Sequence, residues 1–369
     1  MKKKKEKQIK KALKFYLDAN KLKYKIENNN QSAASRLYGR MILAIAINSE
    51  YDETKNIGKT LKILLLKSMM DDNAESLHNN MSKLNDGKKF YKILTSDSKA
   101  KILAQKCINR EKILEYFFEV TVKEKNIFYD DFDKIYELAE EKKIPEIFGN
   151  NKEKNYEIFR FYYLNRKLKF KERTGWDNKH WNVQTEKRET VAEHVIGTIA
   201  LALGLNSEFD FDIDIDKVIY TLAFHEIGEI KIGDITPFDN VSPEEKEKKE
   251  HEAIKSIVGN LRKKDEIVNL LFNFDKKENM DSKIEYLCDK LEADLQSKIY
   301  QDLGYQNPLS EQENNIVFTF DKTKKMVEEG AETAFDIWYM YDKEIYKNNK
   351  KFSKVLKYAR KNDLANNGE

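Results

Sequence analysis

The chain has 369 residues, and 67 basic side chains against 64 acidic ones leave a formal net charge of only +3. Hydrophobic residues make up 40% and aromatic residues 11%, which excludes a wholly disordered chain. Only two cysteines are present, Cys107 and Cys288, which excludes a disulfide framework and a zinc site made of thiolates. The start lacks the apolar core of a signal peptide, and no stretch of about 18 apolar residues follows. We therefore expect a cytoplasmic protein without membrane spans.

The composition favours helix along most of the chain. Glycine and proline, with 13 and 4 residues, are scarce, and no stretch shows sustained strand alternation. In the second half, apolar residues recur at helical spacing. The helices predicted there span residues 156–170, 190–205, 216–230, 243–260, 265–274 and 280–302. Short helices joined by short polar loops predict an all-α protein built from orthogonal helical bundles.

Basic runs lie near both ends of the chain, at residues 2–5 and 343–361. Lysine neutralises phosphate and aromatic side chains stack on bases, so such runs can hold nucleic acid. The near-balance of positive and negative charge favours solvated helix faces instead. We therefore do not expect nucleic-acid binding.

Residues 32–66 align without a gap to residues 190–224. Eleven positions are identical in this alignment: Ala34, Gly39, Leu43, Ala44, Asn48, Ser49, Glu50, Asp52, Ile57, Lys59 and Leu64 match their partners 158 residues on. Two further pairs of similar segments occur in the same order. Upstream, KLKYK at 21–25 is similar to KLKFK at 167–171, and downstream, DSKAKILAQK at 97–106 is similar to DSKIEYLCDK at 281–290. We interpret the chain as a tandem duplication, with domains at 1–150 and 151–369.

The two halves differ at positions whose side chains could bind a metal ion. Four residues of the second half are potential metal ligands that the first half has lost: His194 pairs with Arg36, His225 with Lys67, Glu226 with Ser68, and Asp289 with Gln105. Imidazoles and carboxylates together suit one divalent ion, such as Mn, Co, Ni, Fe, Mg or Zn. We therefore predict a metal site in the second half and none in the first.

Two more carboxylates follow the His225-Glu226 doublet. Glu229 lies four residues after His225, on the same face of the predicted helix, where a carboxylate can orient or deprotonate a metal-bound water. Asp234 follows a glycine, in a loop that can meet a substrate hydroxyl. HEIGE at 225–229 is not the zinc-peptidase motif, because its second histidine is replaced by Glu229.

Four strings in order carry a family resemblance: RTGW at 173–176, TVAEH at 190–194, AFHEIGEIKIGDITP at 223–237 and LCDKLEADLQ at 287–296. Together they resemble the HD-domain phosphohydrolase superfamily, and more narrowly its branch of bacterial 5′-deoxynucleotidases. The resemblance implies an all-α fold. It also implies four metal ligands, His194, His225, the residue at position 226, and Asp289.

The resemblance assigns further roles in the site. It implies that Glu229 is the catalytic carboxylate, and that Arg173, Trp176 and Asp234 contact the phosphate and sugar of a nucleotide. The superfamily doublet is His-Asp, whereas this chain has His225-Glu226. Glutamate is one methylene longer, which shifts the coordinating oxygen by about a bond length.

These observations predict a metal-dependent phosphohydrolase acting on nucleotides, with a deoxynucleoside 5′-monophosphate as the first-choice substrate. Arg173 or Lys290 would offset the negative charge that develops on phosphorus. Two alternatives stay open, a catalytically weak or inactive nucleotide sensor or scaffold, and a hydrolase of nucleoside triphosphates or signalling nucleotides. We further expect residues 1–150 to sit against residues 155–369 as an internal mock dimer, because related enzymes commonly pair as homodimers; further homo-oligomers stay open.

Overall fold

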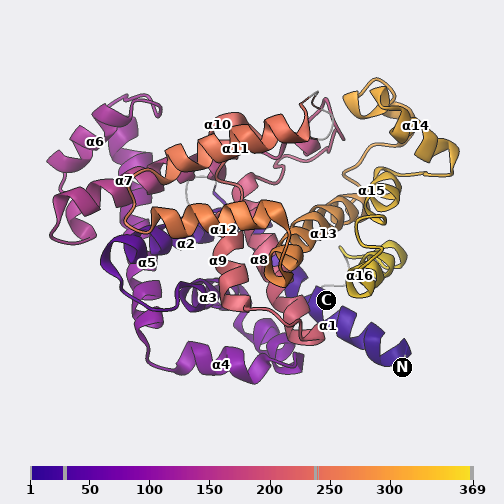
Figure 1. Ribbon diagram of the computed structural model, residues 1–369, viewed down its shortest axis with the longest axis horizontal. Helices are drawn as coiled ribbons and strands as arrows, with labels where there is room; N and C mark the ends of the chain where they lie inside the picture. Colours follow the sequence, from indigo (N-terminus) through magenta and orange to yellow (C-terminus); the bar gives the residue numbers. More distant parts are fainter. Residues whose placement is uncertain (1, 28–30, 237–238, 240, 366–369) are drawn as a thin grey trace.

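The structure is a computed structural model that describes residues 2–27, 31–236, 239 and 241–365. These residues form helices joined by turns, with isolated β-bridges and no strand among them, which confirms the predicted all-α fold class (Figure 1). None of the described helices combines the length and the apolar character that a bilayer crossing requires.

Several helices of the first half begin at polar caps. The helices of this half are α1 (Lys2–Tyr24), α2 (Ala33–Tyr51), α3 (Ile57–Lys83), α4 (Gly87–Thr95), α5 (Lys99–Tyr116), the π-helix η2 (Phe117–Val122) and α6 (Phe132–Glu141). Ser32, Asn56 and Ser98 each accept a hydrogen bond from a backbone N–H of the first turn of α2, α3 and α5, respectively. These side chains satisfy donors that a helix start leaves open, so they fix where each helix begins.

The second half carries more and shorter helices. They are α7 (Lys152–Arg166), α8 (Val191–Phe209), α9 (Ile215–Leu222), α10 (Glu229–Ile232), α11 (Pro243–Val258), α12 (Lys264–Lys276), α13 (Met280–Asp302), α14 (Asp321–Glu328), α15 (Ala334–Asp342) and α16 (Lys350–Lys361). Short 3₁₀ turns complete this half: η3 (Pro145–Ile147), η4 (Lys167–Lys169), η5 (Thr174–Trp176), η6 (Leu309–Glu311) and η7 (Ile316–Thr319). Figure 1 shows α14, α15 and α16 together at the end of the molecule opposite α6.

The helix predicted over residues 216–230 is wrong in its extent. Helix α9 ends at Leu222, residues 223–228 form a turn, and α10 begins at Glu229. Successive i→i+3 hydrogen bonds, such as Ile227 to the Phe224 carbonyl and Glu229 to the Glu226 carbonyl, tighten the backbone there. The turn carries the doublet out of the helix and into the centre of the bundle.

Helices α2 and α8 match in length and in both caps. Each has 19 residues and starts after a hydroxyl cap, Ser32 or Thr190. Each ends at an aspartate in the left-handed region, Asp52 at φ 49° and Asp210 at φ 48°. The aligned segments therefore fold into the same local structure.

The halves pack together through their aligned helices. Helix α1 lies along α8, α7 lies along α2, and α3 packs against α9. One hydrophobic core cluster extends from α1 to α16 across the boundary at residues 145–154, and a smaller cluster joins Trp176 and Trp181 to α13, α14 and α15. The proposed domains at 1–150 and 151–369 thus share one core.

Matching contacts also cross the molecule at the ends of α2 and α8. Two loop amides of the second half bond to the end of α2, and two loop amides of the first half bond to the end of α8. The pairs are Arg262 with Glu50, Lys263 with Ser49, Asn85 with Glu208, and Asp86 with Ser207. Ser207 and Glu208 stand 158 residues after Ser49 and Glu50, so the two sets of contacts are reciprocal.

The contact between α3 and α9 generates a prediction. A Cβ added to Gly58 would stand 2.1 Å from the carbonyl oxygen of Asp216, whose backbone cannot move without displacing α9. We expect Gly58→Ala to lower the free energy of unfolding by about 1–3 kcal/mol, although helix propensity alone favours alanine by about 1 kcal/mol. Urea unfolding measures the change.

Gly228→Ala is the matched control. Gly228 has helical dihedral angles, φ −55° and ψ −37°, and its nearest neighbour atom would lie 3.6 Å from an added Cβ. We expect this variant to be at least as stable as the native protein. Equal stability of the two variants would contradict the close backbone contact at Gly58.

Candidate metal centre

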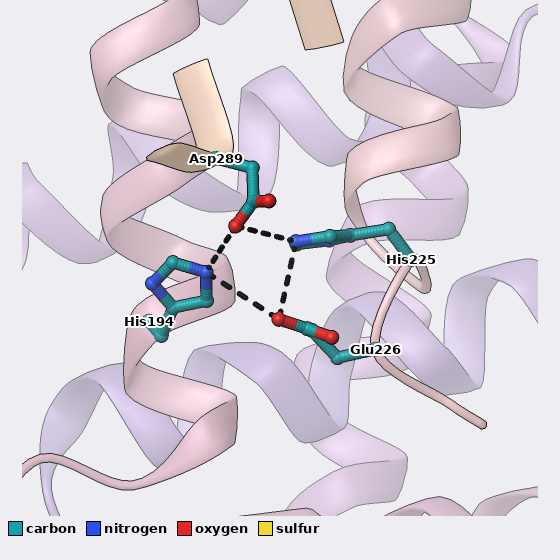
Figure 2. Close-up of side chains that lie close together, drawn as sticks. All are labelled: His194, His225, Glu226 and Asp289. Carbon is teal, nitrogen blue, oxygen red and sulfur yellow. Dashed lines mark hydrogen bonds and ion pairs between the residues drawn. The ribbon is translucent and has the colours of Figure 1, made fainter. Parts of the chain in front are cut away.

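Four predicted ligands converge at one point of the bundle. His194 comes from α8, His225 and Glu226 from the turn after α9, and Asp289 from α13; one ligand atom of each lies within 4.8 Å of the other three (Figure 2). Asp289 Oδ1 is 3.0 Å from His194 Nε2 and 3.7 Å from His225 Nε2. Glu226 Oε1 is 3.6 Å from both of these nitrogens.

Both imidazoles are held through their other ring nitrogen. His225 Nδ1 bonds to the Leu222 carbonyl oxygen at 2.8 Å, and His194 Nδ1 bonds to Glu292 Oε2 at 2.6 Å. Such partners fix the tautomer and turn each Nε2 toward the shared centre. His225 Nε2 is buried and has no hydrogen-bond partner. An unpartnered buried nitrogen is costly, and two imidazoles with two carboxylates are a donor set that a divalent ion fills, so the residues fit the ion.

The longer side chain of the doublet still reaches the centre. Glu226 Oε1 points into the ligand group in Figure 2, beside both imidazoles. The side chain is neither fully buried nor exposed, and its Oε1 also accepts a hydrogen bond from Arg173 Nη1 at 2.9 Å. Glutamate at this position therefore keeps a carboxylate oxygen among the ligands.

Opposing effects set the pKa of His194. Burial and the nearby Arg173 guanidinium lower it, but the carboxylates of Glu292 and Asp289 outweigh both and raise the pKa to about 9. The pKa describes the metal-free site, in which a proton on His194 balances the surrounding carboxylates. An ion that binds Nε2 must displace that proton.

The two carboxylate ligands stay ionised despite their burial. Burial raises the pKa of Asp289, but Lys290 and the two imidazoles hold it well below its usual range. Burial likewise raises the pKa of Glu226, and the positive charges of His225 and Arg173 lower it further than burial raises it. Both carboxylates are thus available as ligands at neutral pH.

A second carboxyl pair adjoins the ligands. Arg173 Nη1 lies 3.5 Å from Glu229 Oε1 and 3.8 Å from Asp234 Oδ1, and the Thr174 amide donates to Asp234 Oδ2 at 2.7 Å. Burial, with Glu226 and Asp234 close by, raises the pKa of Glu229 well above its usual value. Burial also raises the pKa of Asp234, but Arg173 and the Thr174 amide bring it below its usual value. Their pKa values are therefore pushed apart, the pattern expected of a proton-transfer pair.

Lys290 lies at the more open side of the centre. Its ammonium is 3.2 Å from Asp289 Oδ2, and its side chain is 40% exposed. The Asp289 carboxylate raises the pKa of Lys290 and keeps it charged. Lys290 can therefore meet a negatively charged group that approaches from solvent.

Trp176 does not face the ligand group. It is 2% exposed, its indole packs edge-on against Tyr300 with ring centroids 5.3 Å apart, and its Nε1 donates to Glu189 at 3.0 Å. The structure thus brings together all the predicted site residues except Trp176. The RTGW string contains one residue at the centre, Arg173, and one that anchors the loop to the core.

Glu292 is a functional candidate that the sequence reasoning missed. It stands three residues after Asp289, on a neighbouring position of the α13 surface, inside the string LCDKLEADLQ. That i, i+3 spacing is the signal that could have found it, since a ligand histidine needs an acceptor for its second nitrogen.

The positions that replace the ligands in the first half hold ion pairs and hydrogen bonds. Arg36 donates to Glu111 through Nε and Nη2, and Lys67 Nζ donates to Gln105 at 2.8 Å. Over the described part of residues 1–150, no group of three or more His, Cys, Asp or Glu side chains converges as the four ligands do.

His225 Nε2, which has no hydrogen-bond partner, leads to a prediction about metal binding. We expect His225→Ala to weaken binding of Mn²⁺ or Co²⁺ by more than the ~100-fold that loss of an outer partner costs, because it removes a ligand outright. Metal analysis after dialysis and a calorimetric titration measure the loss. His251→Ala is the control, because that histidine stacks on Phe272 and bonds to Asp275 rather than joining the ligand group. Equal metal uptake by the two variants would contradict the site.

Comparison with known proteins agrees with this geometry. The sequence model of the HD domain family matches residues 165–334, which contain all the predicted site residues. The mouse (Mus musculus) protein 5'-deoxynucleotidase HDDC2 is 31% identical over 150 residues, or 40% of this chain and 71% of the relative. The human (Homo sapiens) protein of that name is 29% identical over 153 residues, with coverages of 40% and 71%. The fission yeast (Schizosaccharomyces pombe) 5'-deoxynucleotidase hdd1 is 30% identical over 157 residues, with coverages of 41% and 76%. As its motifs predict, the chain belongs to the HD-domain phosphohydrolase superfamily.

Proposed function

We propose that the protein is a metal-dependent phosphohydrolase that removes the phosphate from a deoxynucleoside 5′-monophosphate. The observation that carries the proposal is the buried group of His194, His225, Glu226 and Asp289, with the unpartnered Nε2 of His225 facing its centre. The names of the relatives supply the substrate class, since the mouse, human and yeast proteins are 5'-deoxynucleotidases.

The four ligands would hold one divalent ion, which supplies a Lewis acid and lowers the pKa of a bound water. Glu229 is the general base or acid of the proposal, because its carboxyl adjoins Glu226, and burial and its acidic neighbours raise its pKa well above the usual value. Arg173, within 4 Å of three carboxylates, moderates their repulsion and can turn toward a phosphate oxygen.

Substrate contacts follow from exposure and charge. We assign the phosphate to Arg173 and Lys290, because Lys290 is charged and reaches the open side of the centre. Asp234 is assigned to the sugar, since a carboxylate held by the Thr174 amide can accept from a hydroxyl. Trp176, being buried, is assigned the support of the RTGW loop rather than a direct contact.

One observation favours a second candidate, a nucleotide sensor without turnover. Arg173 donates to Glu226 at 2.9 Å, so the residue that departs from the superfamily doublet is already paired with a cation. A strong pair at this position would compete with the ion for the carboxylate. The intact Glu229, Asp234 and Asp289 around it favour the enzyme.

We also propose that the chain is an internal duplication whose halves form a pseudo-dimer. Equivalent residues contact each other, as at a two-fold axis: Ser35 donates to Glu193 at 3.5 Å, and Gly58 abuts Asp216. Each of these pairs is separated by 158 residues. The reciprocal contacts at the ends of α2 and α8 support the same symmetry. The unpaired, buried Cys107 and Cys288 are consistent with a cytoplasmic location.

The role of Glu229 can be separated from metal binding. Because Glu229 is buried with a raised pKa, glutamine mimics its neutral form, and we expect Glu229→Gln to fold normally and to bind metal and nucleotide as the native protein does. Phosphate release from deoxynucleoside monophosphates with Mn²⁺, Co²⁺ or Mg²⁺ should fall by about 10²- to 10⁴-fold. Glu285→Gln is the control, since burial raises the pKa of that carboxyl to about 8 and it bonds to Thr221 rather than joining the ligand group. Full activity of Glu229→Gln would remove Glu229 from the mechanism.

A substitution in the His225-Glu226 doublet distinguishes the proposed enzyme from the proposed sensor. We expect the native protein to release phosphate, and Glu226→Asp to change the relative rates with Mn²⁺, Co²⁺ and Mg²⁺, because the shorter side chain withdraws its oxygen by about a bond length. The same phosphate-release assay and a nucleotide-binding titration measure both proteins. A silent native protein that Glu226→Asp activates would favour the sensor, and silence of both with bound nucleotide would exclude the enzyme.

A further inference from the structure

A buried polar chain links the N-terminal helix to the metal centre. We propose that Tyr16 and Lys23 on α1, from the half without ligands, are positioning residues that hold His194 through Glu292. The proposal rests on the proposed function in one respect, because the position of His194 Nε2 matters only if that nitrogen binds an ion.

Glu292 joins α1 to His194 with both carboxylate oxygens. Its Oε2 bonds to His194 Nδ1 at 2.6 Å, while its Oε1 accepts from Tyr16 at 3.0 Å and from Lys23 Nζ at 2.6 Å. None of these side chains is more than 3% exposed. Water therefore cannot replace a lost bond without opening the core, and the orientation of Glu292 depends on α1.

Lys23 also balances the charge of the region. Its ammonium bonds to Glu189 at 2.5 Å and to Gln296 at 3.1 Å, besides Glu292. Glu189 in turn accepts from Trp176 at 3.0 Å, so the same lysine ties the RTGW loop to α13. A buried carboxylate is stable only when it is paired, so Glu292 keeps its charge, and its hold on His194, through Lys23.

A glycine on α8, Gly197, leaves space for the Glu292 carboxylate and the Lys23 ammonium. A Cβ on Gly197 would stand 2.2 Å from Glu292 Oε1 and 2.9 Å from Lys23 Nζ. Gly197 follows His194 by three residues on α8, so the space that it leaves lies beside the ligand. Glycine in a helix interior costs about 1 kcal/mol relative to alanine, and here it admits the lysine–glutamate pair.

The arrangement is repeated around Glu115 of the first half, with a tyrosine and a lysine from the second half and no ligand histidine. Lys169 is the counterpart of Lys23 in the aligned KLK segments, and Tyr162 stands seven residues before it, as Tyr16 stands before Lys23. Tyr162 donates to Glu115 at 2.7 Å, and the Lys169 ammonium forms an ion pair with the same carboxylate at 2.8 Å. The counterpart of Gly197 is Gly39, whose added Cβ would meet the same two side chains at 3.2 and 3.3 Å. The chain thus contains a matched internal control, a similarly buried tyrosine and lysine that hold a glutamate but no histidine.

The experiment compares Tyr16→Phe with Tyr162→Phe in the 369-residue chain. Each change removes one buried hydroxyl that bonds to a glutamate. We expect Tyr16→Phe to weaken Co²⁺ and Mn²⁺ affinity by about 10- to 100-fold in competition titrations and to alter the visible absorption of the Co²⁺ form. Tyr162→Phe should leave both unchanged. In a Glu292→Gln background, Tyr16→Phe should have no further effect on metal affinity, since it acts through that residue.

Lys23→Met and Lys169→Met form a second, harsher pair. Lys23→Met removes the ammonium that pairs with Glu189 and Glu292, so this variant can fail to fold. In that case the Tyr16→Phe result alone tests the proposal. Equal metal affinities of Tyr16→Phe and Tyr162→Phe, with an unchanged Co²⁺ spectrum, would overturn the proposal.

A further readout separates failure of this inference from failure of the proposed function. The chain has five histidines, so selective ¹⁵N labelling resolves the His194 ring without any metal. If the native protein takes up no ion, the proposed function fails. The positioning of His194 is still tested, because Tyr16→Phe should shift and broaden the His194 ring signals whereas Tyr162→Phe should not. Unchanged ring signals in both variants would overturn it.

Discussion

Carboxylates buried away from water must be matched by positive charge, and this constraint shapes everything around His194. Glu226 and Asp289 face the two imidazoles, Glu292 lies behind one of them, and Glu229 and Asp234 adjoin the group. Arg173, Lys290 and Lys23 come from three different segments to balance these charges. A divalent ion at the proposed site would add positive charge at the centre of the group, so that metal binding and the packing of the bundle would depend on the same balance.

The first half meets the same constraint with an arginine. Where the second half has His194, the first has Arg36, whose guanidinium bonds to the buried Glu111 through two nitrogens. Helix α3 also runs without a break through Lys67 and Ser68, whereas α9 ends at Leu222 before the doublet. The interrupted helix is thus specific to the half that carries the ligands, because His225 and Glu226 must leave the helical path to face His194.

Most of the fold follows from local patterns, and most of the site from a comparison of the halves. Helix α13 has the bounds predicted from its apolar spacing, and the four ligands were predicted because the aligned positions of the other half hold different residues. The break after Leu222 was missed because apolar spacing continues through it, and only the ligand contacts across the bundle explain it. The burial of Trp176 depends on Tyr300, more than a hundred residues away, and Lys23 is still farther from Glu292 in sequence. Contacts of this range have no local signal in one sequence.

The exchange of leading helices bears on the proposed duplication. Since α1 lies along α8 and α7 lies along α2, each half buries a helix of the other, and neither of the ranges 1–150 and 151–369 holds its own core complete. In a dimer of identical chains, a change that removes the ligands removes both sites at once. In a fused pair, one half can lose its ligands and still supply the tyrosine and lysine that hold Glu292 in the other. The first half can therefore lack metal ligands while its packing stays constrained, because the other half depends on its side chains. The apolar residues of α2, retained next to the positions where ligands are replaced, agree with this proposal.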